Sequence, residues 1–182
     1  MTVKQFFKSK TFRCIVVLLC IALVSGALLS IMNDVLYVSA EERVQRTIKK
    51  IYGTQIGYDK EGVQFDVYQT DNGSVDEIYP LEDGNYLAKA TGNHGYKEGT
   101  VTIWCVARYD GGEFVGVDNV SIASYEKQTL MGMFTSSVLS GFVGHDELDI
   151  HVVSGATYSE TAVKNAFNSV MVYFRDLKEV QQ

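Results

Sequence analysis

An uncharged apolar run from Cys14 to Met32 constrains this chain more than any other feature. At about 1.5 Å per residue in a helix, the run nearly spans a bilayer core about 30 Å thick. The segment before the run contains no acidic residue and four basic ones: Lys4, Lys8, Lys10 and Arg13. Because basic residues favour the cytoplasmic side, the sequence predicts a cytoplasmic tail over residues 1–13, a transmembrane helix over 14–38 and an extracytoplasmic domain over 39–182.

A cleaved signal peptide is the alternative interpretation of the same run. Val38, Ser39 and Ala40 form an acceptable small-residue cleavage site. The run is longer than the apolar region of most signal peptides, about 7–15 residues, which favours a retained anchor. The expected location is therefore the cell membrane, crossed once, with the membrane itself as a partner.

The segment after the apolar run is acidic and large enough to fold. All 22 acidic residues follow Met32, whereas four of the 16 basic residues precede it, which leaves a formal charge near −10. This balance argues against nucleic acid as a ligand, because phosphate backbones bind basic surfaces. The chain has 46% hydrophobic residues and one proline, so about 140 residues can form one domain with a buried core.

Two amphipathic helices are expected in this domain. The first begins after Ser39, which stands three residues before Glu42 as in a capping box, and ends at Gly53. The second covers residues 159–177. Its apolar stripe consists of Val163, Phe167, Val170, Met171 and Phe174.

Between these helices, apolar residues alternate with a period of two, which predicts antiparallel strands. In one predicted strand Val63, Phe65 and Val67 alternate with polar residues. In another, four residues share one face: Val101, Ile103, Cys105 and Ala107. The predicted fold class is α+β, with one N-terminal transmembrane helix followed by an exported domain of mostly antiparallel sheet with packed helices.

Turn signals divide the strands. The sequences TDNGS at 70–74 and YDGGE at 109–113 predict turns, the second of them within a hairpin. Residues 126–141 are expected to form a loop and a short helix that ends near Gly141. The sequence LDIHVVSG at 147–154 predicts a further strand.

No hydrolytic or metal-binding constellation emerges. His94, His145 and His151 lie on separate segments without zinc-type spacing, and no serine has a nucleophile-elbow context. Three cysteines cannot form a disulfide framework. Cys105 falls within a strand pattern and is expected in the core.

The stretch SGATYSETAV, residues 154–163, allows two roles for Thr157. Thr157 and Glu160 have the spacing of a capping box, in which the threonine only caps the following helix. A helix N-terminus also attracts phosphate through its free N–H groups, and Gly155 lets the backbone come close. On these grounds the stretch is either a cap or a phosphate anchor.

In the longer sequence HVVSGATYSETAV, the chain resembles the FMN-binding domain family. Members serve in the Rnf complex and in sodium-pumping NADH:quinone oxidoreductase, and combine a short tail, one membrane helix and an exported flavin domain. The family's motif carries FMN esterified to its last threonine. The resemblance implies a covalent FMN on Thr157, a phosphate-holding turn of Ser154, Gly155 and Ala156, and bordering contacts from Tyr158 and Ser159.

Two more stretches resemble the family less specifically. EKQTLMG at 126–132 loosely matches a glutamate-threonine-proline-glycine loop that lies against the flavin, although the proline is absent. GYKEGTVTI, from Gly95, resembles the glycine-rich stretch that leads into the family's central strands. The chain also has His151 where the family's motif begins with aspartate. The loop match implies flavin contacts from Glu126, Thr129, Leu130 and Gly132.

The resemblance implies an electron-carrying redox subunit with covalent FMN and no independent substrate site. It would belong to an Rnf-like membrane complex that couples electron transfer between ferredoxin and NAD to sodium or proton translocation. Its expected partners are the other membrane subunits and, for maturation, a flavin transferase. Two alternatives stay open: a free-standing flavinylated electron-transfer protein outside the cytoplasm, and a cofactor-free anchored binding module in which SGAT is only a turn and a cap.

Overall fold

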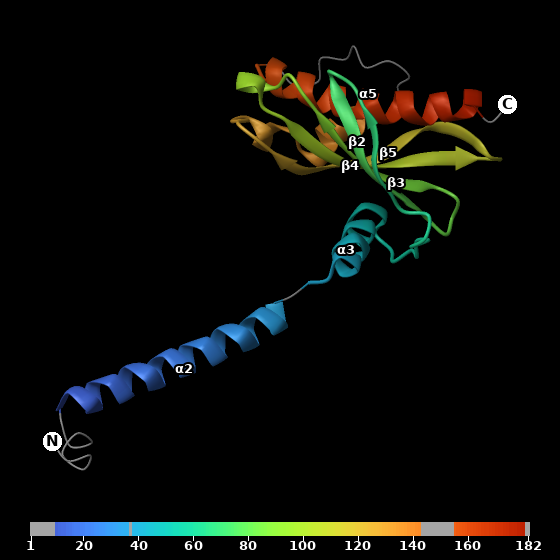
Figure 1. The fold of residues 1–182 in the computed structure, drawn as a ribbon. Coiled ribbons are helices and arrows are strands. Elements are labelled where there is room, and N and C mark those ends of the chain that lie inside the picture. The colour runs from blue at the N-terminus through green and yellow to red at the C-terminus, as the bar shows by residue number, and fades with distance from the viewer. Residues whose placement is uncertain (1–9, 37, 143–154, 181–182) are drawn as a thin grey trace. The chain divides into compact units, whose positions relative to one another are not determined.

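The structure, a computed structural model, describes residues 10–36, 38–142 and 155–180 (Figure 1). The chain divides into two compact units, Met1–Arg43 and Val44–Gln182. The first contains helix α2 (Lys10–Leu36), in which Phe12–Asn33 is long and apolar enough to cross a membrane. A signal sequence near the N-terminus can also be apolar and long enough to meet this criterion, so the helix fits either a membrane anchor or a signal peptide.

Helix α3 (Ala40–Tyr52) confirms the helix predicted after Ser39. The Glu42 N–H donates to Ser39 Oγ at 3.1 Å, so the serine caps the helix. Gly53 ends it with a left-handed φ of +74°, a conformation that glycine adopts without the steric cost of a Cβ. The buried side chains of α3 are Val44 and Ile48.

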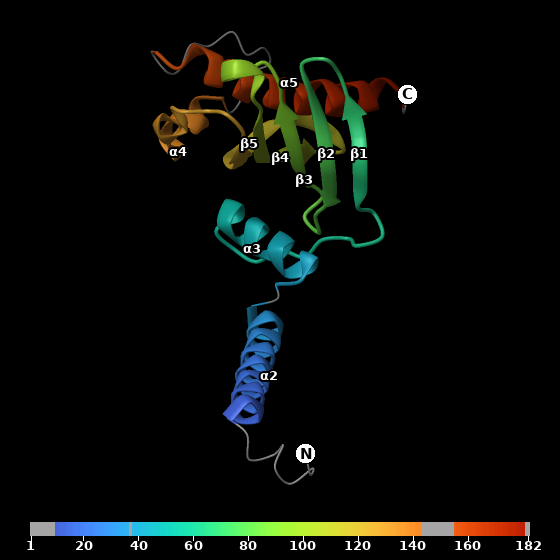
Figure 2. The same ribbon diagram turned by 60° about the vertical axis from the view of Figure 1, so that its left-hand side comes forward.

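One antiparallel sheet follows, with its strands in the order β1-β2-β3-β4-β5 (Figure 2). Each strand pairs with the next one along the chain, so the sheet is a meander and the α+β prediction is confirmed. The strands are β1 (Gln64–Gln69), β2 (Gly73–Pro80), β3 (Tyr86–Gly92), β4 (Val101–Asp110) and β5 (Glu113–Tyr125).

Both predicted turns are present. The Thr70 N–H donates to the Gly73 carbonyl at 2.8 Å where β1 turns into β2. Gly111 and Gly112 have φ values of +59° and +86°, as a tight hairpin between β4 and β5 requires. Glycine at both positions therefore allows the two-residue turn that joins the two longest strands.

The alternating pattern of Val63, Phe65 and Val67 would place all three side chains on one face of the first strand, and this prediction is wrong. Phe65 is 66% exposed, whereas Val67 packs against the core under α5 and Val63 packs against the opposite core. The pairing of β1 with β2 shifts between Phe65 and Tyr68, and Asp66 has a φ of +50°. This bulge reverses the sidedness of the strand, and a period-two count cannot detect it.

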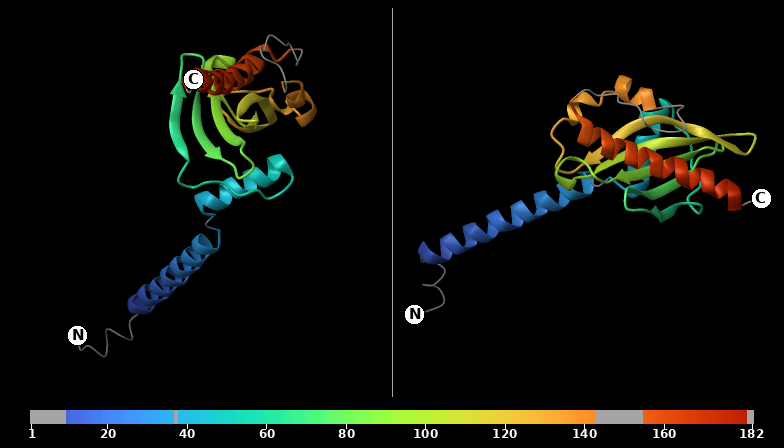
Figure 3. Two further views of the ribbon diagram at one scale, coloured as in Figure 1. Left: turned by 90° about the vertical axis from the view of Figure 1, so that its right-hand side faces the viewer. Right: turned by 90° about the horizontal axis from the view of Figure 1, so that it is seen from above.

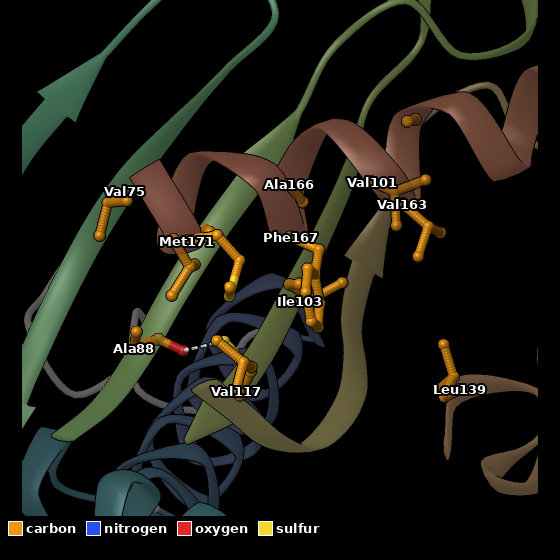
Figure 4. Close-up of a cluster of buried hydrophobic side chains, with 14 of the residues drawn as sticks. Val75, Ala88, Val101, Ile103, Val117, Leu139, Val163, Ala166, Phe167 and Met171 are labelled. Atoms are coloured by element: carbon orange, nitrogen blue, oxygen red, sulfur yellow. Dashed lines mark hydrogen bonds between the residues drawn. The ribbon is translucent and has the colours of Figure 1, made fainter. Parts of the chain in front are cut away.

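Helix α5 (Thr157–Val180) covers one face of the sheet (Figure 3). It begins at Thr157 rather than at Ser159, and its whole predicted stripe is buried, as is the predicted face of β4. Figure 4 shows Phe167, Val163 and Ile103 among the side chains that fill this core. A Cβ on Gly92 would overlap the Ala162 carbonyl, so glycine lets α5 lie close to β3.

The other face of the sheet carries a smaller core. Leu87 and Val106 alternate with residues that face α5, and they pack with Val44 and Ile48 of α3. The two cores therefore use alternate residues of the same strands, which is what period two requires.

After β5 the chain forms the predicted loop and short helix. It contains the 3-10 turn η2 (Met131–Met133), helix α4 (Ser136–Leu139) and the 3-10 turn η3 (Ser140–Phe142). The strand predicted over residues 147–154 lies outside the described residues. The loop leads from the end of β5 toward the start of α5, and these two regions form the candidate site.

Candidate functional site

A cleft of about 310 Å³ opens at the N-terminus of α5. Its walls come from three segments that are distant in sequence: the start of α5, the loop after β5 and the 3-10 turn η1 (Tyr96–Glu98). Ligand pockets span about 300–1,000 Å³, so this cleft is at the small end of the range. The lining residues are Tyr96, Thr129, Leu130, Gly155, Ala156, Thr157, Tyr158 and Ser159.

The lining contains seven of the residues expected from the sequence. Glu126 and Gly132 are not among them: the Glu126 side chain is 70% exposed, with Oε1 3.9 Å from Lys127 Nζ, and Gly132 is exposed. Ser154 and His151 lie outside the described residues. The fold thus brings Thr129 and Leu130, in the middle of the 126–132 loop, close to Thr157. The two ends of that loop, Glu126 and Gly132, do not line the cleft.

The start of α5 tests the capping role considered for Thr157. The Glu160 N–H donates to the Ala156 carbonyl at 2.9 Å, so Ala156 occupies the N-cap position and Thr157 is the first helical residue. In a capping box the threonine itself precedes the first helical residue. The capping-box interpretation of Thr157 and Glu160 is therefore wrong.

Thr157 is exposed and lines the cleft. Its carbonyl accepts a hydrogen bond from Thr161 Oγ1 at 2.9 Å, whereas its own hydroxyl bonds to no residue that the structure describes. The N–H groups of a first helical turn and the helix dipole favour a negative group at this end. An exposed hydroxyl beside them is suited to carry a phosphate ester.

Gly155 has a φ of +86°, and a Cβ built on it would meet no atom of the described residues within 4 Å. The need for glycine here is therefore conformational rather than steric, because other residues adopt this backbone region at a cost. The turn directs the chain into α5 at Thr157.

Two tyrosine rings flank the cleft. The centroids of Tyr96 and Tyr158 are 6.5 Å apart and their planes are inclined by 62°. Tyr96 is 38% exposed and Tyr158 67% exposed. Lys97 Nζ lies 5.3 Å from the Tyr96 ring centroid and adds a positive charge at the rim. Exposed aromatic faces of this kind suit a flat aromatic ligand.

The loop that carries Tyr96 is strained. His94, Lys97 and Glu98 have φ values of +62°, +52° and +55°. A non-glycine residue in the left-handed region costs about 1–3 kcal/mol, and such residues persist only where surrounding contacts hold them. The cleft wall that contains Tyr96 is therefore maintained by its contacts.

Gln128 supplies the contacts that join this loop to the other two walls of the cleft. It is 7% exposed, and its Oε1 accepts hydrogen bonds from the Tyr96 N–H at 3.1 Å and from Ser159 Oγ at 2.8 Å. Its Nε2 donates to the Glu126 carbonyl at 3.0 Å. One buried amide thus joins the three walls of the cleft.

Sequence reasoning missed both Tyr96 and Gln128. Each lies within a stretch that the sequence singled out, GYKEG or EKQTLMG, but no periodic pattern marks either residue. The glycines of GYKEG were a usable signal, because close-packed backbone around a buried side chain requires them.

The acidic residue of the first turn of α5 is neutralised by a lysine. Glu160 is 2% exposed, and its Oε1 lies 3.2 Å from Lys164 Nζ one turn later. Such an i, i+4 pair stabilises a helix. The Lys164 ammonium therefore offsets the negative charge of Glu160 at the start of the helix.

A larger hollow, about 410 Å³, lies beside β5 and α4. Lys50 is the one ionisable residue in its lining, which is otherwise formed by aliphatic, hydroxyl and amide side chains and Phe134. It contains none of the predicted site residues. The cleft at α5, with a free hydroxyl, a helix N-terminus and two aromatic rings, is the stronger candidate.

Comparison with protein-family models, with curated proteins and with solved structures returns no match to this chain. Across the described residues, no group of three or more His, Cys, Asp or Glu side chains could hold a metal ion.

Proposed function

We propose that this chain is a membrane-anchored electron carrier with FMN joined to Thr157 Oγ1 through a phosphoester. We further propose that it serves in an Rnf-like complex that couples electron transfer between ferredoxin and NAD to sodium or proton translocation. The observation that carries the proposal is the place of Thr157, an exposed hydroxyl at the first residue of α5, within a cleft that also contains two aromatic rings.

The residues of the cleft fit both halves of FMN. The N–H groups of the first turn of α5 and the open backbone at Gly155 would receive the phosphate. Tyr96, Tyr158 and Leu130 would contact the isoalloxazine ring, since all three are exposed side chains at the cleft. A small cleft would leave part of the ring exposed, as electron transfer to a partner requires.

FMN supplies the redox chemistry when bound, so the chain needs to provide attachment, orientation and electrostatics. Thr157 would fix the phosphate end, and the tyrosines would orient the ring. Ser159 is buried and bonded to Gln128, so it would support the cleft wall.

The proposed topology has the N-terminus in the cytoplasm and the flavin domain on the extracytoplasmic side. It is supported by the length of the apolar helix and by the four basic residues that precede or begin it. The proposed partners are the other membrane subunits of the complex and the transferase that attaches the flavin. A free-standing flavinylated carrier would use the same cleft with other partners.

Intact mass of the protein purified from its native membrane tests this proposal. The expected mass exceeds the polypeptide by FMN less one water, and the excess should be absent from Thr157→Ala. A wild-type mass equal to the bare polypeptide, with or without cleavage of the N-terminal segment, contradicts covalent flavin. Copurifying membrane subunits distinguish the complex from the free-standing carrier.

A further inference from the structure

We propose that Gln128 is a positioning residue that holds Tyr96 at the mouth of the cleft and thereby sets the contact between the Tyr96 ring and the flavin. The inference rests on the proposed function for the identity of the ligand. Its structural part concerns the chain alone and can be tested without flavin.

The hydrogen bonds of Gln128 fix the orientation of its amide. The Tyr96 N–H can only donate, so the atom 3.1 Å away must be the oxygen. That oxygen also accepts from Ser159 Oγ, and the nitrogen donates to the Glu126 carbonyl and, at 3.5 Å, to the Tyr96 carbonyl. Both polar atoms of the side chain are therefore fully used, with two bonds each.

Two glycines make room for this amide. A Cβ on Gly99 would lie 2.6 Å from Gln128 Nε2, and a Cβ on Gly95 would lie closer still. The Gly95 N–H donates to the Gly99 carbonyl at 2.9 Å and closes the loop between them. The backbone on both sides of Tyr96 is thus folded around the Gln128 side chain.

The same loop needs an external restraint. Lys97 and Glu98, which follow Tyr96, are both left-handed and would relax if nothing held the loop. The Tyr96 N–H and carbonyl are bonded to Gln128, so the restraint acts on the residue whose ring borders the cleft. Loss of the Gln128 amide should release the ring from its place beside Tyr158.

The test compares holoprotein variants of Gln128 with a matched control. Gln128→Met keeps the approximate volume and removes the strong hydrogen bonds, whereas Gln128→Glu keeps two acceptors and loses the donors. Asn85→Ala is the control, because Asn85 Oδ1 accepts from the Tyr109 N–H at 3.0 Å, a bond of the same type among residues that do not line the cleft. The readouts are hydrogen exchange at the Tyr96 amide and flavin fluorescence.

In Gln128→Met we expect exchange at the Tyr96 amide to rise by about tenfold or more, as loss of a buried hydrogen bond allows. Flavin fluorescence should rise, because a nearby tyrosine quenches an excited flavin by electron transfer. Tyr96→Leu should raise it as well, and adding Gln128→Met to Tyr96→Leu should raise it no further. Asn85→Ala should change neither readout.

The outcomes separate the two proposals. A wild-type protein whose mass shows no flavin contradicts the proposed function. In that case, hydrogen exchange at the Tyr96 amide still tests whether Gln128 holds the Tyr96 loop in place. A flavinylated protein in which Gln128→Met leaves exchange and fluorescence at wild-type values overturns the role of Gln128 alone. If Gln128→Met does not fold, Gln128→Glu decides: its retained acceptor should keep the Tyr96 amide protected, and fast exchange in the folded variant overturns the inference.

Discussion

Ser159 Oγ donates a hydrogen bond to Gln128 Oε1 at 2.8 Å, and both side chains are buried. This bond joins the first turn of α5 to the loop after β5. It therefore connects two segments that the sequence singled out separately, residues 126–132 and residues 154–163. Neither sequence pattern alone indicates that these two side chains are bonded to each other. The geometry of the cleft depends on this connection as much as on the motif residues.

Replacing Ser159 by alanine should destabilise the domain while leaving Thr157 in place. The variant leaves Gln128 Oε1 with one donor instead of two, which should lower the free energy of unfolding by about 0.5–1.5 kcal/mol. Denaturant unfolding measures the change. Ser140→Ala is the control, because its exposed hydroxyl donates to the Ser137 carbonyl and should matter by less than about 0.5 kcal/mol. Equal effects of the two variants would show that the buried bond has no special weight.

Gly155→Ala should lower the free energy of unfolding by about 1 kcal/mol or more, because alanine is strained at a φ of +86°. Gly132→Ala is a matched control: a Cβ there also meets open space, but the backbone is not left-handed. Gly155→Asn should be milder than Gly155→Ala, since asparagine tolerates this region better. If Gly132→Ala is as destabilising as Gly155→Ala, backbone strain is not the cause.

Several elements of the fold followed from the sequence because they obey a simple period. The stripe from Val163 to Phe174 follows the helical period and the face from Val101 to Ala107 follows the period of two of a strand, so each pattern predicts burial directly. Phe65 was misplaced because a bulge breaks the period. Such irregularities depend on pairing with another strand, which no local pattern reports.

The candidate site was predictable where a motif was continuous and not where contacts join distant segments. Gly155 to Ser159 form one run at the start of a helix, and all five line the cleft. Tyr96 lines the cleft, and Gln128 holds it there, only through tertiary contacts. The glycines beside Tyr96 point to a close-packed loop, but they do not show which distant segment the loop packs against. Glu126 was expected at the cleft from its place in the loop, but the chain turns at Lys127, whose φ is +58°, and the Glu126 side chain is exposed.

Cys105 should be protected from thiol reagents and should make stability depend on pH. Full burial raises the pKa of this thiol from 9.0 to about 12, and its Sγ lies 3.9 Å from the Ala88 carbonyl oxygen. The reactive form is the thiolate, so alkylation of Cys105 at pH 8 should require unfolding. Mass analysis of the Cys105 peptide after alkylation measures this protection.

The sign of the pH effect follows from the raised pKa. The unfolded chain loses the Cys105 proton above about pH 9, whereas the folded chain keeps it until about pH 12. Folding stability should therefore fall between these values, by about 1.4 kcal/mol per pH unit from this group. The difference in the free energy of unfolding between wild type and Cys105→Ala isolates the contribution of this thiol. Urea unfolding between pH 8 and pH 10 measures that difference. A difference that does not change with pH would contradict burial of the neutral thiol.

Topology can be tested with protease added to the outside of spheroplasts. The proposed orientation predicts digestion of the domain after about residue 40 and protection of the tail before Arg13, because basic residues stay on the cytoplasmic side. A tag on each end, read by immunoblot, reports the fragments. Digestion of the domain only after the cytoplasmic face is opened would reverse the orientation and remove the extracytoplasmic function.

Thr157→Ala separates attachment from folding. Thr157 is the first helical residue and not the cap, so alanine should change the free energy of unfolding by less than about 0.5 kcal/mol. The proposed function nevertheless predicts complete loss of covalent flavin and of electron transfer through this chain. Thr157→Ser keeps a hydroxyl and shows how strictly the transferase requires threonine. A marked loss of stability in Thr157→Ala would show that the hydroxyl has a structural role.

The most direct measurement is the mass of the proteolytic peptide that contains Thr157, taken from protein purified from its native membrane. The account predicts a peptide heavier than its sequence by FMN less one water, with the addition located on Thr157 by fragmentation. It predicts yellow absorbance that persists after denaturation and is lost in Thr157→Ala. An unmodified Thr157 peptide from native protein would contradict the account, and so would full activity of Thr157→Ala.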